Sequence, residues 1–399
     1  MKLLAAAALL VLAGATIVKA TLDLDVDLAS HLEHLSTQRY PNEKHNDGRL
    51  NAQTYIKERF INYGLKVFEH KFNTTVALDP LGVQNVYETV EGVNIIGVAE
   101  AVSNKPGAVL LVGADYDTNG IDDPMFTNGA GVAAMLEVAR LFMHNTRWTG
   151  LYWQNFTTIF VAFDLNTREH QVSPGVPGAK HFITDYLWSY LNKSDTNFGG
   201  AFILDSIMNV NYNEGSQTVD DSFQKMFPDT YQRVINGGKK GDFLSAITLT
   251  GTKSDMLQSQ FTGSYHKDRR LSMYRLESMK INKEAPLGRL IKELTKPSTI
   301  HFWTFTANNT ETPLPAILLT DTQGLRQMPP PPEVCVKGCP AKEWLTQDRV
   351  DFMDTTVRAL TRTLMSRQGI QLPQTDAGVT SLPSLVMTLM IVLTVRIYQ

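Results

Sequence analysis

Carboxylate and amide side chains follow three apolar segments of this chain. Residues 108–112 lead into Asp115, residues 201–204 lead into Asp205, and the apolar stretch that ends at Phe163 is followed by Asn166. A carboxylate is an oxygen ligand that can bind a metal ion. A co-catalytic zinc site, however, needs several imidazole and carboxylate ligands around two ions about 3.5–4 Å apart, and a further carboxylate as general base. Asp115 and Asp205 alone fall short of that set.

The pattern of apolar residues predicts the elements that position these side chains. Helical spacing predicts helices within 27–64, 129–142, 178–191, 222–235, 287–294 and 350–364. Apolar or alternating runs predict strands at 66–72, 93–99, 108–112, 157–163, 201–205 and 316–319. Strands that alternate with helices indicate an α/β fold whose sheet is covered on both faces. We therefore expect a three-layer α/β/α sandwich, formed as one domain by residues 21–370.

Residues 108–142 resemble the zinc exopeptidases of clan MH, peptidase family M28. In that family the strand ends in His-x-Asp, and Asp-Asn-x-x-Gly opens the next helix. This chain keeps the helix entry as Asn128-Gly129-Ala130-Gly131, but Asp115 stands at the histidine position and Thr127 at the position of the aspartate that bridges both zinc ions. The resemblance extends over most of residues 45–365, is weakest between about 210 and 298, and implies a mixed, mostly parallel central sheet.

The resemblance also implies that other active-site residues are replaced. Asn166 stands at the general-base position and Thr167 at the next zinc ligand, whereas Asp205 matches a ligand that is retained. The family's late histidine ligand has no counterpart, because no histidine follows His301. We therefore expect no catalytic residues, no bound metal and no cofactor. Displaced ligands, with Glu169 or Asp115 restoring a metal site, are the alternative.

A degenerate site still needs its remaining carboxylates to be stabilised. Two carboxylates that face one pocket without a metal repel each other, so we expect Thr127 and Asn166 to donate hydrogen bonds to Asp115 and Asp205. The predicted function is a catalytically inactive peptidase-like ectodomain that binds a protein or peptide, as in the zinc-free relatives nicastrin and nicalin. The alternative is an active zinc aminopeptidase with rearranged ligands. A third possibility is a lumenal subunit of a membrane complex.

The amino-terminal sequence and the sequons indicate the secretory pathway. Residues 1–20 have the basic start, apolar run and small residues of a signal peptide. Acceptor motifs for N-glycosylation occur at four asparagines: Asn73, Asn155, Asn192 and Asn308. In a secreted protein, Cys335 and Cys339 are expected to close a small disulfide loop. The formal net charge of -3 gives no reason to expect nucleic acid as a partner.

The carboxyl-terminal tail, residues 371–399, predicts attachment to a membrane at the cell surface. Its apolar run from 382 to 395 is shorter than the roughly 20 residues that a spanning helix needs. The small residues Asp376, Ala377 and Gly378 precede it, as at a cleavage site for a glycolipid anchor. A glycolipid anchor is the favoured interpretation. A short transmembrane helix and a plain tail are the alternatives.

Overall fold

The computed structural model describes the central part of the chain in ten segments. These are residues 24–79, 86–102, 107–120, 123–148, 154–166, 175–267, 274–282, 297–308, 310–328 and 340–369. Several predictions fall outside them: the signal peptide 1–20, the helix at 287–294, Thr167, Glu169, Cys335, Cys339, Asp376, Ala377, Gly378 and the rest of the tail 371–399.

An eight-stranded mixed sheet runs through the molecule in the order β1-β2-β4-β3-β5-β10-β6-β7. The strands are β1 (Lys66–Ala77), β2 (Tyr87–Ala99), β3 (Val109–Asp115), β4 (Thr157–Phe163), β5 (Phe198–Asp205), β10 (Ala316–Thr320), β6 (Phe243–Leu249) and β7 (Arg275–Ile281). The pairs β4–β3, β3–β5, β5–β10 and β6–β7 are parallel, and the remaining three are antiparallel. The predicted α/β fold with a mostly parallel sheet is confirmed.

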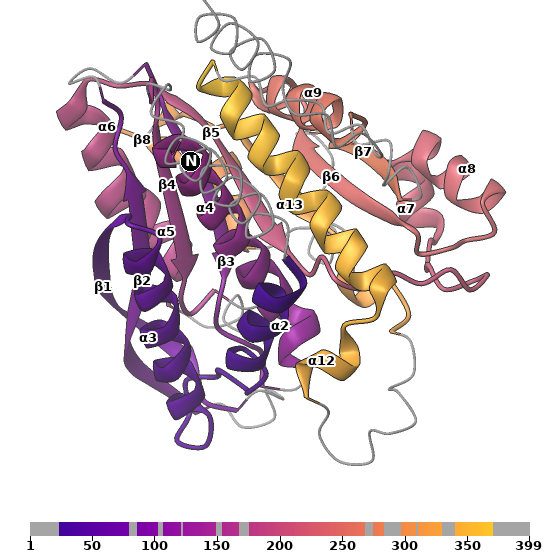
Figure 1. Ribbon diagram of the computed structural model, residues 1–399, viewed down its shortest axis with the longest axis horizontal. Coiled ribbons are helices and arrows are strands. Elements are labelled where there is room, and N and C mark those ends of the chain that lie inside the picture. Colours follow the sequence, from indigo (N-terminus) through magenta and orange to yellow (C-terminus); the bar gives the residue numbers. More distant parts are fainter. Residues whose placement is uncertain are drawn as a thin grey trace, which may run out of the picture.

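Helices cover both faces of the sheet (Figure 1). One face packs against α2 (Leu24–His34), α3 (Asn46–Asn62), α4 (Ala130–Trp148), α9 (Ser254–Tyr265) and α13 (Gln347–Arg367). The other face packs against α5 (Gly178–His181), η3 (Phe182–Leu187), α6 (Trp188–Ser194), α7 (Asp221–Met226) and α11 (Pro297–Trp303). Shorter or peripheral elements are η1 (Met125–Gly129), α8 (Pro228–Asn236), β8 (Thr306–Ala307), β9 (Thr310–Glu311), η5 (Gln323–Leu325) and α12 (Ala341–Trp344).

The central strands are apolar along their whole length because both of their faces are covered. Strands β3 and β4 are buried at every position, which is the burial expected of parallel strands between two helical layers. Helix α4 approaches β5 closely through Gly131, where a Cβ atom would lie 2.6 Å from the carbonyl oxygen of Leu204. Only glycine allows that approach, and it brings the start of α4 to the end of β5.

The structure differs from the sequence predictions in the carboxyl-terminal half. The helix predicted at 222–235 is two helices, α7 and α8, because Pro228 starts α8 and disfavours helical backbone at Phe227 before it. Strands β6 and β7 and helix α9 were not predicted from the sequence. Across the described segments, no helix combines the length and the apolar character required to span a bilayer.

The end of α13 is fixed to the start of β4. The Gln368 side chain accepts a hydrogen bond from the backbone nitrogen of Phe156 and donates one to its backbone oxygen, both at 2.9 Å. The Arg367 guanidinium lies 5.6 Å from the centre of the Phe156 ring. The last described residues therefore lie at the amino-terminal edge of the parallel strands.

Candidate functional site

The predicted site residues meet at the opposite edge of the sheet. Asp115 ends β3, Asp205 ends β5, Thr320 ends β10, and Asn166 follows β4. These four strands are parallel to one another. Their carboxyl ends therefore share one edge, which is where ligands bind in open α/β sheets.

Asp115 is held by two neutral donors. The Asn166 amide nitrogen lies 3.0 Å from Asp115 Oδ1, and the Ser298 hydroxyl lies 3.3 Å from Asp115 Oδ2. Asn166 is fully buried, and its side-chain oxygen accepts a hydrogen bond from the backbone nitrogen of Ala179 at 3.3 Å. The prediction that Asn166 donates to a remaining carboxylate is confirmed. The amide thus satisfies one oxygen of Asp115.

Asp205 is held by two hydroxyl groups. Ser206 Oγ lies 3.1 Å from Asp205 Oδ1, and the Thr320 hydroxyl donates to Asp205 Oδ2 at 3.1 Å. Ser206 Oγ also lies within hydrogen-bond distance of the backbone oxygen of Thr127. Ser206 adopts a left-handed backbone conformation, with φ of 34°. Such strain in a non-glycine residue persists only where the surrounding contacts hold it.

Thr127 does not contact the carboxylates as predicted. It lies in η1, where its hydroxyl donates to the backbone oxygen of Asp123 at 2.7 Å. This bond to the residue four positions earlier is the usual choice for a threonine inside a helix. The expectation that Thr127 donates to Asp115 or Asp205 is therefore wrong. The hydroxyl donors of the site are instead Ser206, Ser298 and Thr320, which the sequence analysis did not select.

A buried ion pair lies beside this cluster and was also missed. The Arg49 guanidinium donates to Asp164 Oδ2 at 2.6 Å, and the same oxygen accepts from the backbone nitrogen of Val93 at 2.9 Å. Burial raises the pKa of Asp164, Arg49 opposes that rise, and Asp117 adds to it. Burial alone would lower the pKa of Arg49, but the Asp164 carboxylate outweighs it, and the pKa is raised. This pair fixes β4 just before Asn166.

The donors that the described residues supply at this edge do not make up the set that two zinc ions need. Across the described segments, no three His, Cys, Asp or Glu side chains are grouped as metal ligands. Among the partners described above, the oxygens of Asp115 and Asp205 lie beside amide and hydroxyl donors. His301 lies on α11, three residues after Ser298; burial lowers its pKa to about 4, and the nearby Lys180 adds to this.

The model of Peptidase family M28 matches residues 94–244. This segment is M28-like. It contains the second half of β2, strands β3, β4 and β5, and the candidate site residues Asp115, Thr127, Asn166 and Asp205. A comparison with curated proteins found no match. The family model therefore supports the resemblance over the part of the chain that carries the candidate site.

Solved structures of glutaminyl cyclases and aminopeptidases are similar to this chain. The glutaminyl cyclase of Porphyromonas gingivalis aligns with a TM-score of 0.51 at 12% identity, covering 86% of this chain and 99% of that one. The glutaminyl cyclase of Fimbriiglobus ruber aligns with a TM-score of 0.47 at 15% identity, covering 85% and 95%. The LapA aminopeptidase of Legionella pneumophila aligns with a TM-score of 0.45 at 10% identity, covering 90% and 75%. At these identities the similarity concerns the fold.

The four acceptor asparagines of the glycosylation motifs lie on the surface. Asn73, Asn155, Asn192 and Asn308 are all exposed. Asn155 is the most constrained of them, because its side-chain nitrogen donates to the backbone oxygen of Gln368 at 3.2 Å. These positions are therefore accessible in the folded chain.

Proposed function

We propose that this M28-like domain is a secreted, membrane-tethered binding module that does not hydrolyse peptides. The hydrogen bond from the Asn166 amide to Asp115 carries the proposal. An amide at this position cannot accept the proton of an attacking water, which is the task of the general base in zinc peptidases. The hydroxyl partners of Asp205 support the same function, because they stabilise a carboxylate without a metal.

Metal content and turnover test the loss of catalysis. The purified chain is expected to contain far less than one zinc per molecule by elemental analysis. It is expected to release no product from aminoacyl substrates or from peptides with an amino-terminal glutamine. About one zinc per chain, together with turnover that a chelator abolishes, would show that the protein is instead an active zinc aminopeptidase. Its metal ligands would then be supplied in part by residues such as Glu169.

The tether and the compartment are proposed from the sequence. The predicted signal peptide, the exposed sequons and the small residues Asp376 to Gly378 support a cell-surface protein on a glycolipid anchor. Phosphatidylinositol-specific phospholipase is expected to release the protein from expressing cells. Protein that stays in the membrane after this treatment and keeps residues 395–399 would have a transmembrane helix instead.

A further inference from the structure

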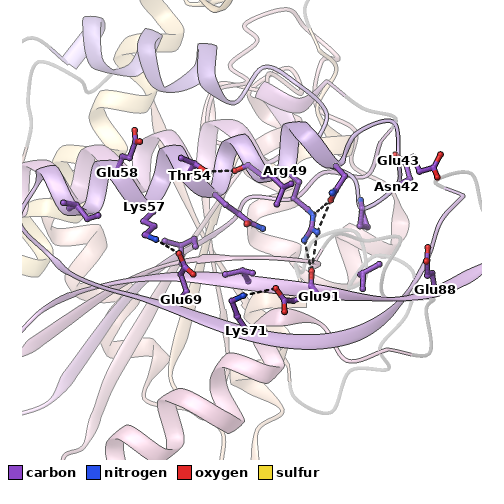
Figure 2. A pocket seen from close by; sticks show the side chains of 18 residues that line it. Asn42, Glu43, Arg49, Thr54, Lys57, Glu58, Glu69, Lys71, Glu88 and Glu91 are labelled. Atoms are coloured by element: carbon purple, nitrogen blue, oxygen red, sulfur yellow. Dashed lines mark hydrogen bonds and ion pairs between the residues drawn. The ribbon is translucent and has the colours of Figure 1, made fainter.

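A groove with a volume of about 760 Å³ lies between helix α3 and strands β1 and β2 (Figure 2). Neither Asp115 nor Asp205 lines it. One wall is a stripe along α3 that includes Leu50, Thr54 and Ile61, residues whose spacing places them on one helical face. The strands form the opposite wall. The groove is therefore separate from the candidate active site and lies over the β1–β2 end of the sheet.

Acidic side chains outnumber basic ones along this groove. Five glutamates and three basic residues line it: Glu43, Glu58, Glu69, Glu88, Glu91, Arg49, Lys57 and Lys71. Lys57 pairs with Glu69 at 2.6 Å and Lys71 pairs with Glu91 at 3.2 Å, while Arg49 is bound to Asp164. Glu43, Glu58 and Glu88 then have no ion-pair partner in the segments that the structure describes. The groove thus presents a net negative charge to a ligand.

The negative groove also exposes apolar surface. Leu50 and Ile61 on α3 are 45% and 53% exposed, and Val90, Val93 and Ile95 line the strand side. A single exposed apolar residue on a surface is ordinary. Val93 and Ile95 are only 8% and 1% exposed, so the accessible apolar surface of the groove comes mainly from Leu50 and Ile61 on α3. Two exposed apolar residues along one wall of a groove suit a ligand that has apolar side chains of its own.

We propose that the groove binds an extended segment of a partner protein in which lysine or arginine residues alternate with apolar residues. This inference rests on the proposed binding function and names the class of its partner. Figure 2 shows Glu58 toward one end of the groove and Glu43 and Glu88 toward the other. A ligand that meets both ends must carry more than one separated cation, and the exposed Leu50 and Ile61 along α3 favour a peptide over a polyamine. The volume lies within the usual range of ligand sites, about 300–1,000 Å³.

Fluorescence anisotropy of a labelled peptide, acetyl-Lys-Val-Arg-Leu-Lys-Val-amide, tests the proposal on the full chain. The blocked ends prevent the peptide from acting as an aminopeptidase substrate. We expect saturable binding that weakens with added salt, since exposed charges are screened over ~8 Å at physiological ionic strength. The double variant Glu43→Gln/Glu88→Gln is expected to weaken binding roughly tenfold.

Two further variants make the test specific to the groove. Glu214→Gln/Glu343→Gln removes the same two charges from exposed positions that do not line the groove and is expected to leave affinity unchanged. Lys71→Gln removes a positive charge that repels the basic peptide and frees Glu91 from its ion pair, so it is expected to strengthen peptide binding. Circular dichroism and melting temperatures establish that the variants fold.

Four outcomes would overturn the groove proposal. These are the absence of peptide binding, equal binding of acetyl-Glu-Val-Gln-Leu-Glu-Val-amide, equal weakening by the control variant, or tight binding of spermine in place of the peptide. If the groove variants bind the peptide with the affinity of the parent, the partner binds at another surface, and the proposed binding function still stands. Zinc-dependent turnover, by contrast, would refute the proposed function whether or not the groove binds.

Discussion

The Asn166 side-chain nitrogen lies 3.0 Å from the Asp115 carboxylate, and Asn166 is fully buried. In this geometry an amide hydrogen of Asn166 points at an oxygen of the Asp115 carboxylate. The two residues lie 51 positions apart in the chain, at the ends of the neighbouring strands β3 and β4. Their contact joins the two strands at the edge of the sheet where the candidate site lies.

Removing the amide should cost more stability than neutralising the carboxylate. Asn166→Ala leaves Asp115 Oδ1 without this buried donor and is expected to lower the free energy of unfolding by about 1–3 kcal/mol. Asp115→Asn can accept from Asn166 and donate to Ser298, so its melting temperature should equal or exceed that of the parent. Urea unfolding measures the free energy, and a thermal melt followed by circular dichroism measures the melting temperature. A large loss of stability in Asp115→Asn alone would show that the charge itself is needed.

The Arg49–Asp164 pair should be sensitive to loss of one partner. Arg49→Met leaves a fully buried carboxylate without its cation and is expected to destabilise the fold by about 3–5 kcal/mol. Adding Asp164→Asn should recover much of that loss, because the remaining amide carries no buried charge. Chemical denaturation of the single and double variants measures this coupling. Equal stability of the single and the double variant would contradict this coupling between Arg49 and Asp164.

His301 should make the protein less stable in mild acid. Its pKa is lowered from 6.5 to about 4 in the folded chain, first by burial and then by Lys180. Between these values only the unfolded chain binds the proton, so stability is present above pH 6.5 and is lost as the pH falls toward 4. His301→Gln should flatten this slope, which is at most about 1.4 kcal/mol per pH unit. Parallel slopes for parent and variant, measured by denaturation at several pH values, would contradict the assignment.

Single reversions toward the zinc enzymes should not create a peptidase. Asp115→His and Thr127→Asp each restore one ligand type, but Asn166 would still be unable to act as a base. Thr127→Asp also removes a hydroxyl that donates to the backbone oxygen of Asp123. Neither variant is expected to turn over aminoacyl substrates with added zinc. Measurable activity in either one would show that the site retains more of its catalytic machinery than the described residues supply.

The central strands could be predicted from the sequence because burial on both faces demands apolar residues throughout. Strand β6 was missed although it is buried at every position, since Ser245 and Thr248 interrupt its apolar run. Helix α9 buries the polar residues Ser254 and Gln258, which hides its apolar spacing. Strand β7 alternates buried and exposed residues. Alternation of this kind is a sequence pattern typical of strands and could have identified β7.

The candidate site could be predicted only in part, because three of the four hydrogen bonds described for its carboxylates come from residues far along the chain. Asp115, Asn166 and Asp205 follow recognisable strands. Ser298 reaches Asp115 from α11, a helix that lies 183 residues further along the chain, and no local pattern connects the two. Thr320 directly follows the predicted strand at 316–319, so its place at the same edge as Asp205 could have been inferred from parallel pairing.

The attachment of Gln368 to Phe156 has a consequence for orientation. The described chain ends at the amino-terminal edge of the parallel strands, and Asp115 and Asp205 lie at the carboxyl edge. If the protein is tethered to a membrane as proposed above, the described domain is attached through its amino-terminal edge, and Asp115 and Asp205 lie at the other edge of the sheet. A partner on a neighbouring cell could then reach the carboxyl edge, whereas one in the same bilayer would meet the opposite end of the domain.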